Sequence, residues 1–78
     1  MPIREHDVVR VIALNTLERE YSGSSGIARA PRIGDVGTVI IAPRNGKPAG
    51  WFHIEMCRED GHSVWMADFH ESELELVR

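Results

Sequence analysis

The sequence is poor in cysteine and in long apolar runs. Cys57 is the only cysteine among 78 residues, which excludes an internal disulfide and a zinc site built from several cysteines. No apolar run approaches the ~18 residues that span a bilayer, and residues 1–7 lack the apolar segment of a signal peptide. We therefore expect a cytoplasmic protein that does not contact membranes.

Lysine is equally scarce, and the charge is unevenly placed. Lys47 is the only lysine, and the formal net charge is -3. Residues 1–54 carry seven Arg or Lys against five acids, a net +2, whereas residues 55–78 carry seven acids against two arginines, a net -5. Nucleic-acid binding requires a clustered excess of Lys and Arg. The composition therefore disfavours a nucleic-acid ligand and suits an acidic C-terminal third that meets a basic partner.

The length of the chain limits its organisation. Seventy-eight residues make one domain, 1–78, and a domain this short buries only about 60% of its unfolded surface. Without disulfides to stabilise it, such a domain has modest stability unless it associates.

The first half of the chain predicts two strands and a long loop. Residues 7–14 are rich in β-branched residues, and a turn with Gly34 and Gly37 opens into a second β-branched run that ends at residue 41. Between them, residues 15–33 contain a Ser/Gly-rich stretch at 22–26, which we expect to be flexible. A short helical turn is expected at 16–20.

The clearest motif is a β-hairpin. Two alternating runs, 51–58 and 62–69, flank Asp60-Gly61, a dipeptide typical of two-residue hairpin turns. This turn sets the register. One side then carries the apolar pairs Phe52 with Phe69, Ile54 with Ala67 and Met56 with Trp65, and the other carries His53 with Asp68, Glu55 with Met66 and Cys57 with Val64. The apolar side is predicted to form the core.

The end of the chain completes the predicted fold. Residues 70–77 are typical of a tight 3-10 turn followed by a short closing strand. Five strands in this order predict an all-β, five-stranded SH3-like barrel with a long first loop and a 3-10 turn before the last strand. An OB-type barrel is the alternative, but it needs a helix where this chain has only the Asp60-Gly61 turn.

Several short motifs carry a resemblance to known families. They are Asp7-Val8-Val9, Gly34-Asp35-Val36-Gly37-Thr38-Val39, Phe52-His53-Ile54-Glu55 before Glu59-Asp60-Gly61, and Glu73-Leu74-Glu75-Leu76-Val77. On these motifs the chain is similar to an uncharacterised bacterial family of small SH3-like barrel proteins, although its loop at 15–33 is longer. That resemblance implies the fold and no established activity.

The glycine turn alone, residues 33–41, also resembles the KOW motif of ribosomal and transcription-elongation proteins. This resemblance implies contact with RNA or protein. A basic patch for nucleic acid would need the loop residues Arg19, Arg29, Arg32, Arg44 and Lys47 to gather at one end of the barrel, with Trp51 as a stacking platform.

Catalytic and metal-binding arrangements are weak. His53 and Cys57 lie four positions apart on one strand, hence ~13 Å from each other, too far for a nucleophile and its base. His6, His62 and His70 lack the spacing of metal ligands. We expect no enzymatic activity, no cofactor, no metal and no small-molecule substrate.

The outward side of the hairpin is the predicted contact surface. It carries Trp51, Val64 and Met66, with Glu55 and Asp68 beside them, whereas such a side is usually polar. Either the long loop covers these residues or they bind a protein partner or a second copy of the chain. The sequence therefore predicts a non-enzymatic protein-binding module or small adaptor. The alternatives are a KOW-like nucleic-acid-associated domain and an acidic inhibitor or immunity-type protein that neutralises a basic enzyme.

Overall fold

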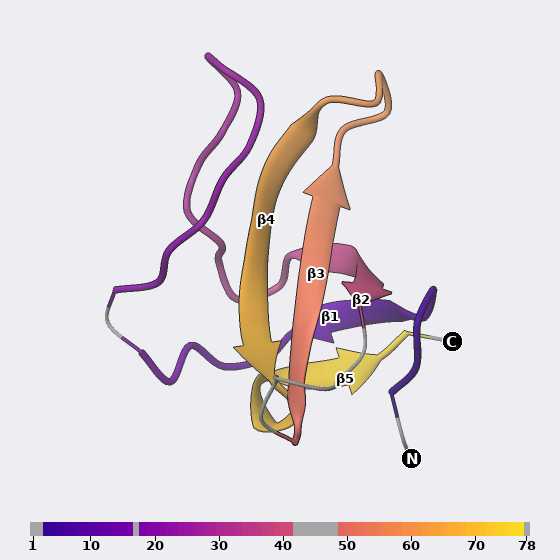
Figure 1. Cartoon of the computed structure of the whole chain (residues 1–78). Coiled ribbons are helices and arrows are strands. Elements are labelled where there is room, and N and C mark those ends of the chain that lie inside the picture. Colours follow the sequence, from indigo (N-terminus) through magenta and orange to yellow (C-terminus); the bar gives the residue numbers. More distant parts are fainter. Residues whose placement is uncertain (1–2, 17, 42–48, 78) are drawn as a thin grey trace.

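The computed structural model describes residues 3–16, 18–41 and 49–77. The elements within them are β1 (Val8–Val11), β2 (Val36–Ile41), β3 (Trp51–Cys57), β4 (Ser63–His70), the 3-10 turn η1 (Glu71–Glu73) and β5 (Leu74–Leu76), shown in Figure 1. The prediction of five strands with a 3-10 turn before the last is confirmed. No helix in this part of the chain is long and apolar enough to cross a membrane.

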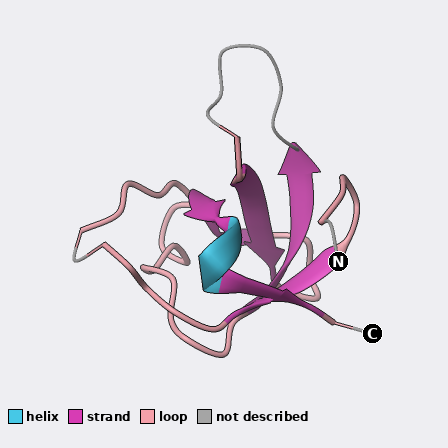
Figure 2. Ribbon diagram, turned by 90° about the horizontal axis from the view of Figure 1, so that it is seen from below, coloured by secondary structure: helices cyan, strands magenta, loops and turns pink. Residues whose placement is uncertain are grey.

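The strands form one antiparallel sheet in the order β4-β3-β2-β1-β5. In Figure 1, β3 and β4 form a long ribbon, and β1, β2 and β5 cross it at a steep angle. Figure 2, seen from below, shows η1 in cyan at the junction of β4 and β5. Within the described residues no ladder joins the edge strands β4 and β5, so the sheet is not closed and the predicted barrel is not confirmed.

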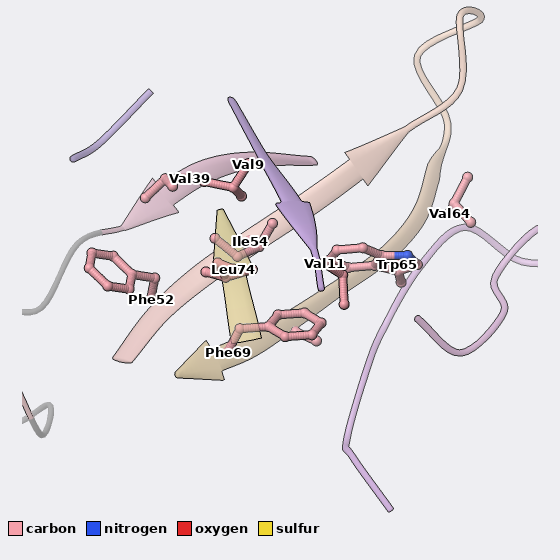
Figure 3. Close-up of a cluster of buried hydrophobic side chains, with 10 residues drawn as sticks. Val9, Val11, Val39, Phe52, Ile54, Val64, Trp65, Phe69 and Leu74 are labelled. Carbon is pink, nitrogen blue, oxygen red and sulfur yellow. The ribbon is translucent and has the colours of Figure 1, made fainter. Parts of the chain in front are cut away.

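The core is formed by the inward side chains of all five strands, as Figure 3 shows. Its buried members are Val9, Val11, Val39, Phe52, Ile54, Val64, Trp65, Ala67, Phe69 and Leu74. The rings of Trp65 and Phe69 pack with their centroids 5.3 Å apart, and Met56 is only partly buried at the margin. The prediction that Phe52, Ile54, Trp65 and Phe69 are buried together is confirmed.

The hairpin register agrees with the prediction along most of β3 and β4 and departs from it near the turn. Met56 pairs with Trp65 as predicted, but Cys57 pairs with Ser63 and not with Val64. Val64 is therefore an extra residue in β4, a β-bulge. Because the bulge lets Val64 and Trp65 both turn inward, Val64 is buried, with 7% of its surface exposed.

The turn itself explains the bulge. The amide of Arg58 donates to the carbonyl of His62 at 2.8 Å, so the loop holds three residues and not the predicted two. Gly61, with φ at 89°, supplies the left-handed backbone that this longer turn requires. One extra residue in the turn shifts the register by one position, and the bulge at Val64 shifts it back.

The Ser/Gly-rich part of the long loop packs against β4, so the expectation that it is flexible is wrong. Ser22 and Met66 exchange two backbone hydrogen bonds, at 2.7 and 3.1 Å, and the amide of Ser24 donates to the carbonyl of Ser63 at 2.9 Å. A Cβ atom at Gly23 would lie 2.8 Å from the carbonyl oxygen of Val64. Glycine thus permits the close approach of the two backbones.

The helical turn expected at 16–20 is not seen in the described residues of that range. Thr16 and Glu18 lie in bends, and Arg19 and Glu20 have no regular structure. Leu17 lies outside the described residues. The irregular backbone of residues 18–20 places the Arg19 side chain on the core, against the ring of Phe69.

Candidate functional site

The structure places four of the five predicted contact residues on the outer side of the hairpin. Trp51, Glu55, Met66 and Asp68 are half-buried there, but Val64 belongs to the core. The prediction that Val64 faces outward is wrong because of the bulge in β4. Figure 3 shows Val64 at the margin of the core beside the long loop, whose residue Arg29 donates its amide to the Val64 carbonyl at 3.1 Å.

The outer side of the hairpin is held by polar contacts within the chain. His53 Nδ1 lies 2.8 Å from Asp68 Oδ1, which confirms the predicted cross-strand pair. The Ser63 hydroxyl donates to the Glu55 carboxylate. This surface is therefore less apolar than the sequence predicts, because its acids bind neighbouring groups.

A shallow hollow of about 260 Å³ lies between the loop and this side of the hairpin. Its lining residues are Glu20, Tyr21, Ser22, His53, Met66, Ala67 and Asp68. Two predicted contact residues, Met66 and Asp68, thus meet loop residues that the sequence did not connect to them. Tyr21, 44% exposed, contributes the large apolar side chain of the hollow.

A different surface carries more exposed apolar side chains. Val9 and Val11 on β1 point into the core, so Val8 and Ile12 point outward, with 41% and 44% of their surfaces exposed. Val36 on β2 is 38% exposed and lies diagonally across from Val8. We call Val8, Ile12 and Val36 the outer apolar patch. Ile33, 64% exposed, lies on the turn that leads into β2.

An exposed ion pair lies within the outer apolar patch. Arg10 Nη1 donates to Glu75 Oε1 at 2.7 Å, and the two side chains are 44% and 47% exposed. Arg10 pairs with Val36 on β2 and with Glu75 on β5 in the sheet. Arg10 therefore lies among the residues of the patch, and Glu75 lies at its β5 edge.

The sequence reasoning missed this patch for a physical reason. Arg10 marks positions 8, 10 and 12 as the outward set, but Val8 and Ile12 of that set are apolar, and the strand pattern alone does not show that they stay exposed. Their place beside Val36 follows from the pairing of β1 with β2.

Asp35 fixes the end of the long loop. Its carboxylate accepts two hydrogen bonds from Arg29, at 2.8 and 3.0 Å, one from the Arg32 amide at 2.9 Å and one from Trp65 Nε1 at 2.9 Å. Desolvation alone would raise the pKa of Asp35, but these donors outweigh it and lower the pKa below its ordinary value. Asp35 thus joins the loop to the core tryptophan.

Glu73 fixes the start of the same loop. Its side chain is fully buried and accepts from Arg19 Nη2 at 2.5 Å and from the amides of Asn15 and His70, each at 2.8 Å. The Arg19 guanidinium also lies 4.1 Å from the centre of the Phe69 ring. Although burial raises the pKa of Glu73, these hydrogen bonds lower it below its ordinary value.

These contacts bear on the basic patch that the sequence predicts for a nucleic-acid ligand. Arg19 and Arg29 bind carboxylates of the same chain, and Arg44 and Lys47 lie outside the described residues. The described residues therefore do not bring together the predicted basic patch. Trp51, its predicted stacking platform, packs its ring edge-on against His70 with the centroids 5.4 Å apart.

His53 and Cys57 are the two side chains of the hairpin whose residue types suit a base and its nucleophile. His53 is paired with Asp68, and desolvation and the nearby Glu55 carboxylate raise the pKa of the Cys57 thiol, which leaves less of the reactive thiolate. No group of three or more His, Cys, Asp or Glu in this part of the chain is placed to hold a metal ion.

Comparisons of the chain with protein-family models, with curated proteins and with solved structures find no match. The geometry described above is therefore the basis of the functional argument.

Proposed function

We propose that this protein is a non-enzymatic protein-binding module on an SH3-like barrel scaffold, and that its outer apolar patch contacts the partner. The observation that carries the proposal is the exposure of Val8, Ile12 and Val36 on one face of β1 and β2. The outward face of such strands is usually polar, and exposed apolar residues that cluster together mark contact surfaces.

The strand order supports the SH3-like interpretation. The chain places a long loop between β1 and β2, a tight hairpin between β3 and β4, and a 3-10 turn before β5, with β1 between β2 and β5. The strand order, the hairpin and the 3-10 turn are features that the sequence resemblance implies, whereas the long loop is the feature in which the chain departs from that family. A small domain of this kind fills its interior with core side chains, so a recognition surface lies outside.

The contacts of the charged residues favour this function over the two alternatives. A nucleic-acid ligand needs free basic side chains, but Arg19 and Arg29 are bound to carboxylates. An acidic inhibitor needs free carboxylates, but Glu73 is buried and Glu75 is paired with Arg10. Contact through the outer apolar patch requires neither free basic side chains nor free carboxylates.

A comparison of two surface variants tests the proposal. We expect Val36→Glu to reduce capture of partner protein from an extract of the native host at least tenfold, because a charge replaces an apolar contact. Glu59→Gln, in the exposed hairpin turn, is the matched control and should leave capture unchanged. Each variant must melt within a few degrees of the wild type.

Contact through Trp51, Glu55, Met66 and Asp68 stays a prediction, and the same experiment separates it from the patch. Loss of capture in Met66→Glu with retention in Val36→Glu would move the contact surface to the hairpin. Equal capture by all the variants would contradict the proposed function.

A further inference from the structure

The outer apolar patch and the neighbouring strand β5 have a pattern that complements itself. Arg10 on β1 stands beside Glu75 on β5, 2.7 Å apart. Two residues along, the Val77 amide donates to the Val8 carbonyl at 2.9 Å, so Val8 stands beside Val77. Val77 follows Glu75 by two positions and therefore shares its outward face. On this face, the pair Arg10 and Glu75 carries one charge of each sign, and the neighbouring pair Val8 and Val77 is apolar.

We infer that this face binds a second copy of the chain across a two-fold axis. The axis runs parallel to β1 and β5 and lies between the two facing sheets, above the gap between these strands. The inference rests on the proposed function and names its partner. Rotation about this axis exchanges the two strands and keeps the position along them. It therefore places Arg10 over Glu75 of the second copy, and Val8 over Val77.

The charges favour a second copy over a partner of another kind. The charged side chains that face outward on the described parts of β1, β2 and β5 are Arg10 and Glu75, one of each sign. A strongly basic or acidic partner finds no excess of opposite charge on this face. An isologous interface, in contrast, needs each group and its complement on the same surface.

The side chains are long enough for the exchange. Packed sheets lie about 10 Å apart, a distance that Arg and Glu side chains span together. Each ion pair, now exposed within one chain, is then shared between two chains and shielded from water by the valines. The valines would supply the apolar contact of this interface, and Arg10 would be an anchor that the surrounding contacts shield from water.

A charge-reversal experiment tests the inference on the full chain by analytical ultracentrifugation. We expect the wild type to dimerise, and we expect Arg10→Glu and Glu75→Arg each to raise the dissociation constant at least tenfold, since like charges then face each other. An equimolar mixture of the two variants should recover a 1:1 dimer, because each acid again meets an arginine. Both variants should stay folded, since an exposed pair contributes little to stability.

The hairpin turn provides the matched control. Arg58 and Asp60 form another exposed ion pair, 3.1 Å apart, in the turn of the hairpin, which lies at the end away from β5 in Figure 1. Arg58→Glu and Asp60→Arg should each dimerise like the wild type. A wild type that stays monomeric up to about 1 mM, or a mixture of Arg10→Glu and Glu75→Arg that stays monomeric, would overturn the inference. If Val36→Glu still loses capture of another protein, the proposed function would survive that outcome.

Discussion

The β3–β4 hairpin and the long loop before β2 lie against each other, but different forces hold them. Alternate side chains of β3 and β4 are buried in the core. The loop places Ile27 only partly against the core and is held instead by backbone bonds to β4 and by the carboxylates of Asp35 and Glu73. Apolar burial persists over a wide pH range, whereas carboxylate contacts depend on ionisation. We therefore expect the loop to open before the hairpin as the pH falls.

The largest expected effect is in the hairpin. Trp65→Ala should cost about 3 to 5 kcal/mol, because the side chain is fully buried and the surrounding residues cannot fill its space. A loss of this size removes most of the stability of a small domain. Urea unfolding followed by circular dichroism measures it. Trp51→Ala, which removes a half-buried ring packed edge-on against His70, should cost only about 1 kcal/mol, and equal losses would contradict the assignment of the core.

The next effect is at the start of the loop. Glu73→Gln should cost about 3 kcal/mol, because it leaves the Arg19 charge without its buried partner. Asp60→Asn is the matched control. It breaks the ion pair of Asp60 with Arg58, which is about half exposed, and should leave the urea concentration at the midpoint of unfolding almost unchanged. If the two variants unfold at the same urea concentration, the loop does not depend on the Glu73 contact.

A smaller and more local effect is expected where the loop meets β4. Gly23→Ala should cost about 1 to 2 kcal/mol, because the new methyl group lies too close to the Val64 carbonyl. Amide hydrogen exchange at Met66, which bonds to Ser22, should become faster, whereas exchange at Ile54 should not change. Ser25→Ala, in the exposed turn of the loop, should leave both rates as they are.

The last expected effect appears only in acid. The pKa values of Asp35 and Glu73 are lowered in the folded protein, so the unfolded chain binds more protons near pH 4. The free energy of unfolding is therefore highest above the ordinary carboxyl pKa of about 4 and falls as the pH decreases through the folded values. Urea unfolding at several pH values measures this slope, which should be shallower in Glu73→Gln. An unchanged slope would show that Glu73 does not contribute.

The two regions also differ in how much of them the sequence predicts. The hairpin pattern is local, because the core-facing residues Phe52, Ile54 and Met56 of β3 each pair with an apolar residue of β4 a short distance along the chain. The orientation of Val64 is predicted wrongly, because the length of the turn and the bulge depend on backbone geometry that no side chain specifies. The strand pairs Ile54 with Ala67 and Phe52 with Phe69 are predicted correctly because the bulge cancels the extra turn residue.

The loop and the outer apolar patch could not be predicted in the same way. The order of the loop comes from contacts between residues far apart in sequence, such as Arg19 with Glu73. Its Ser/Gly composition alone is typical of a flexible segment. Among the predicted contact residues, Met66 and Asp68 do lie together. The loop side of their hollow is formed by residues 20–22, which the backbone pairing of Ser22 with Met66 brings there, and no sequence pattern indicates that pairing.

The Glu73 carboxylate has a further consequence, for the folding pathway. It bonds residues that are 54 and 58 positions away in the chain, whereas the hairpin joins Cys57 to Ser63. Because the entropy of closing a long segment must be lost before its contacts form, we expect the hairpin to be structured in the transition state and the Glu73 contacts to form after it. Stopped-flow kinetics of Glu73→Gln should then show faster unfolding with an almost unchanged folding rate, and a slower folding rate would place these contacts in the nucleus.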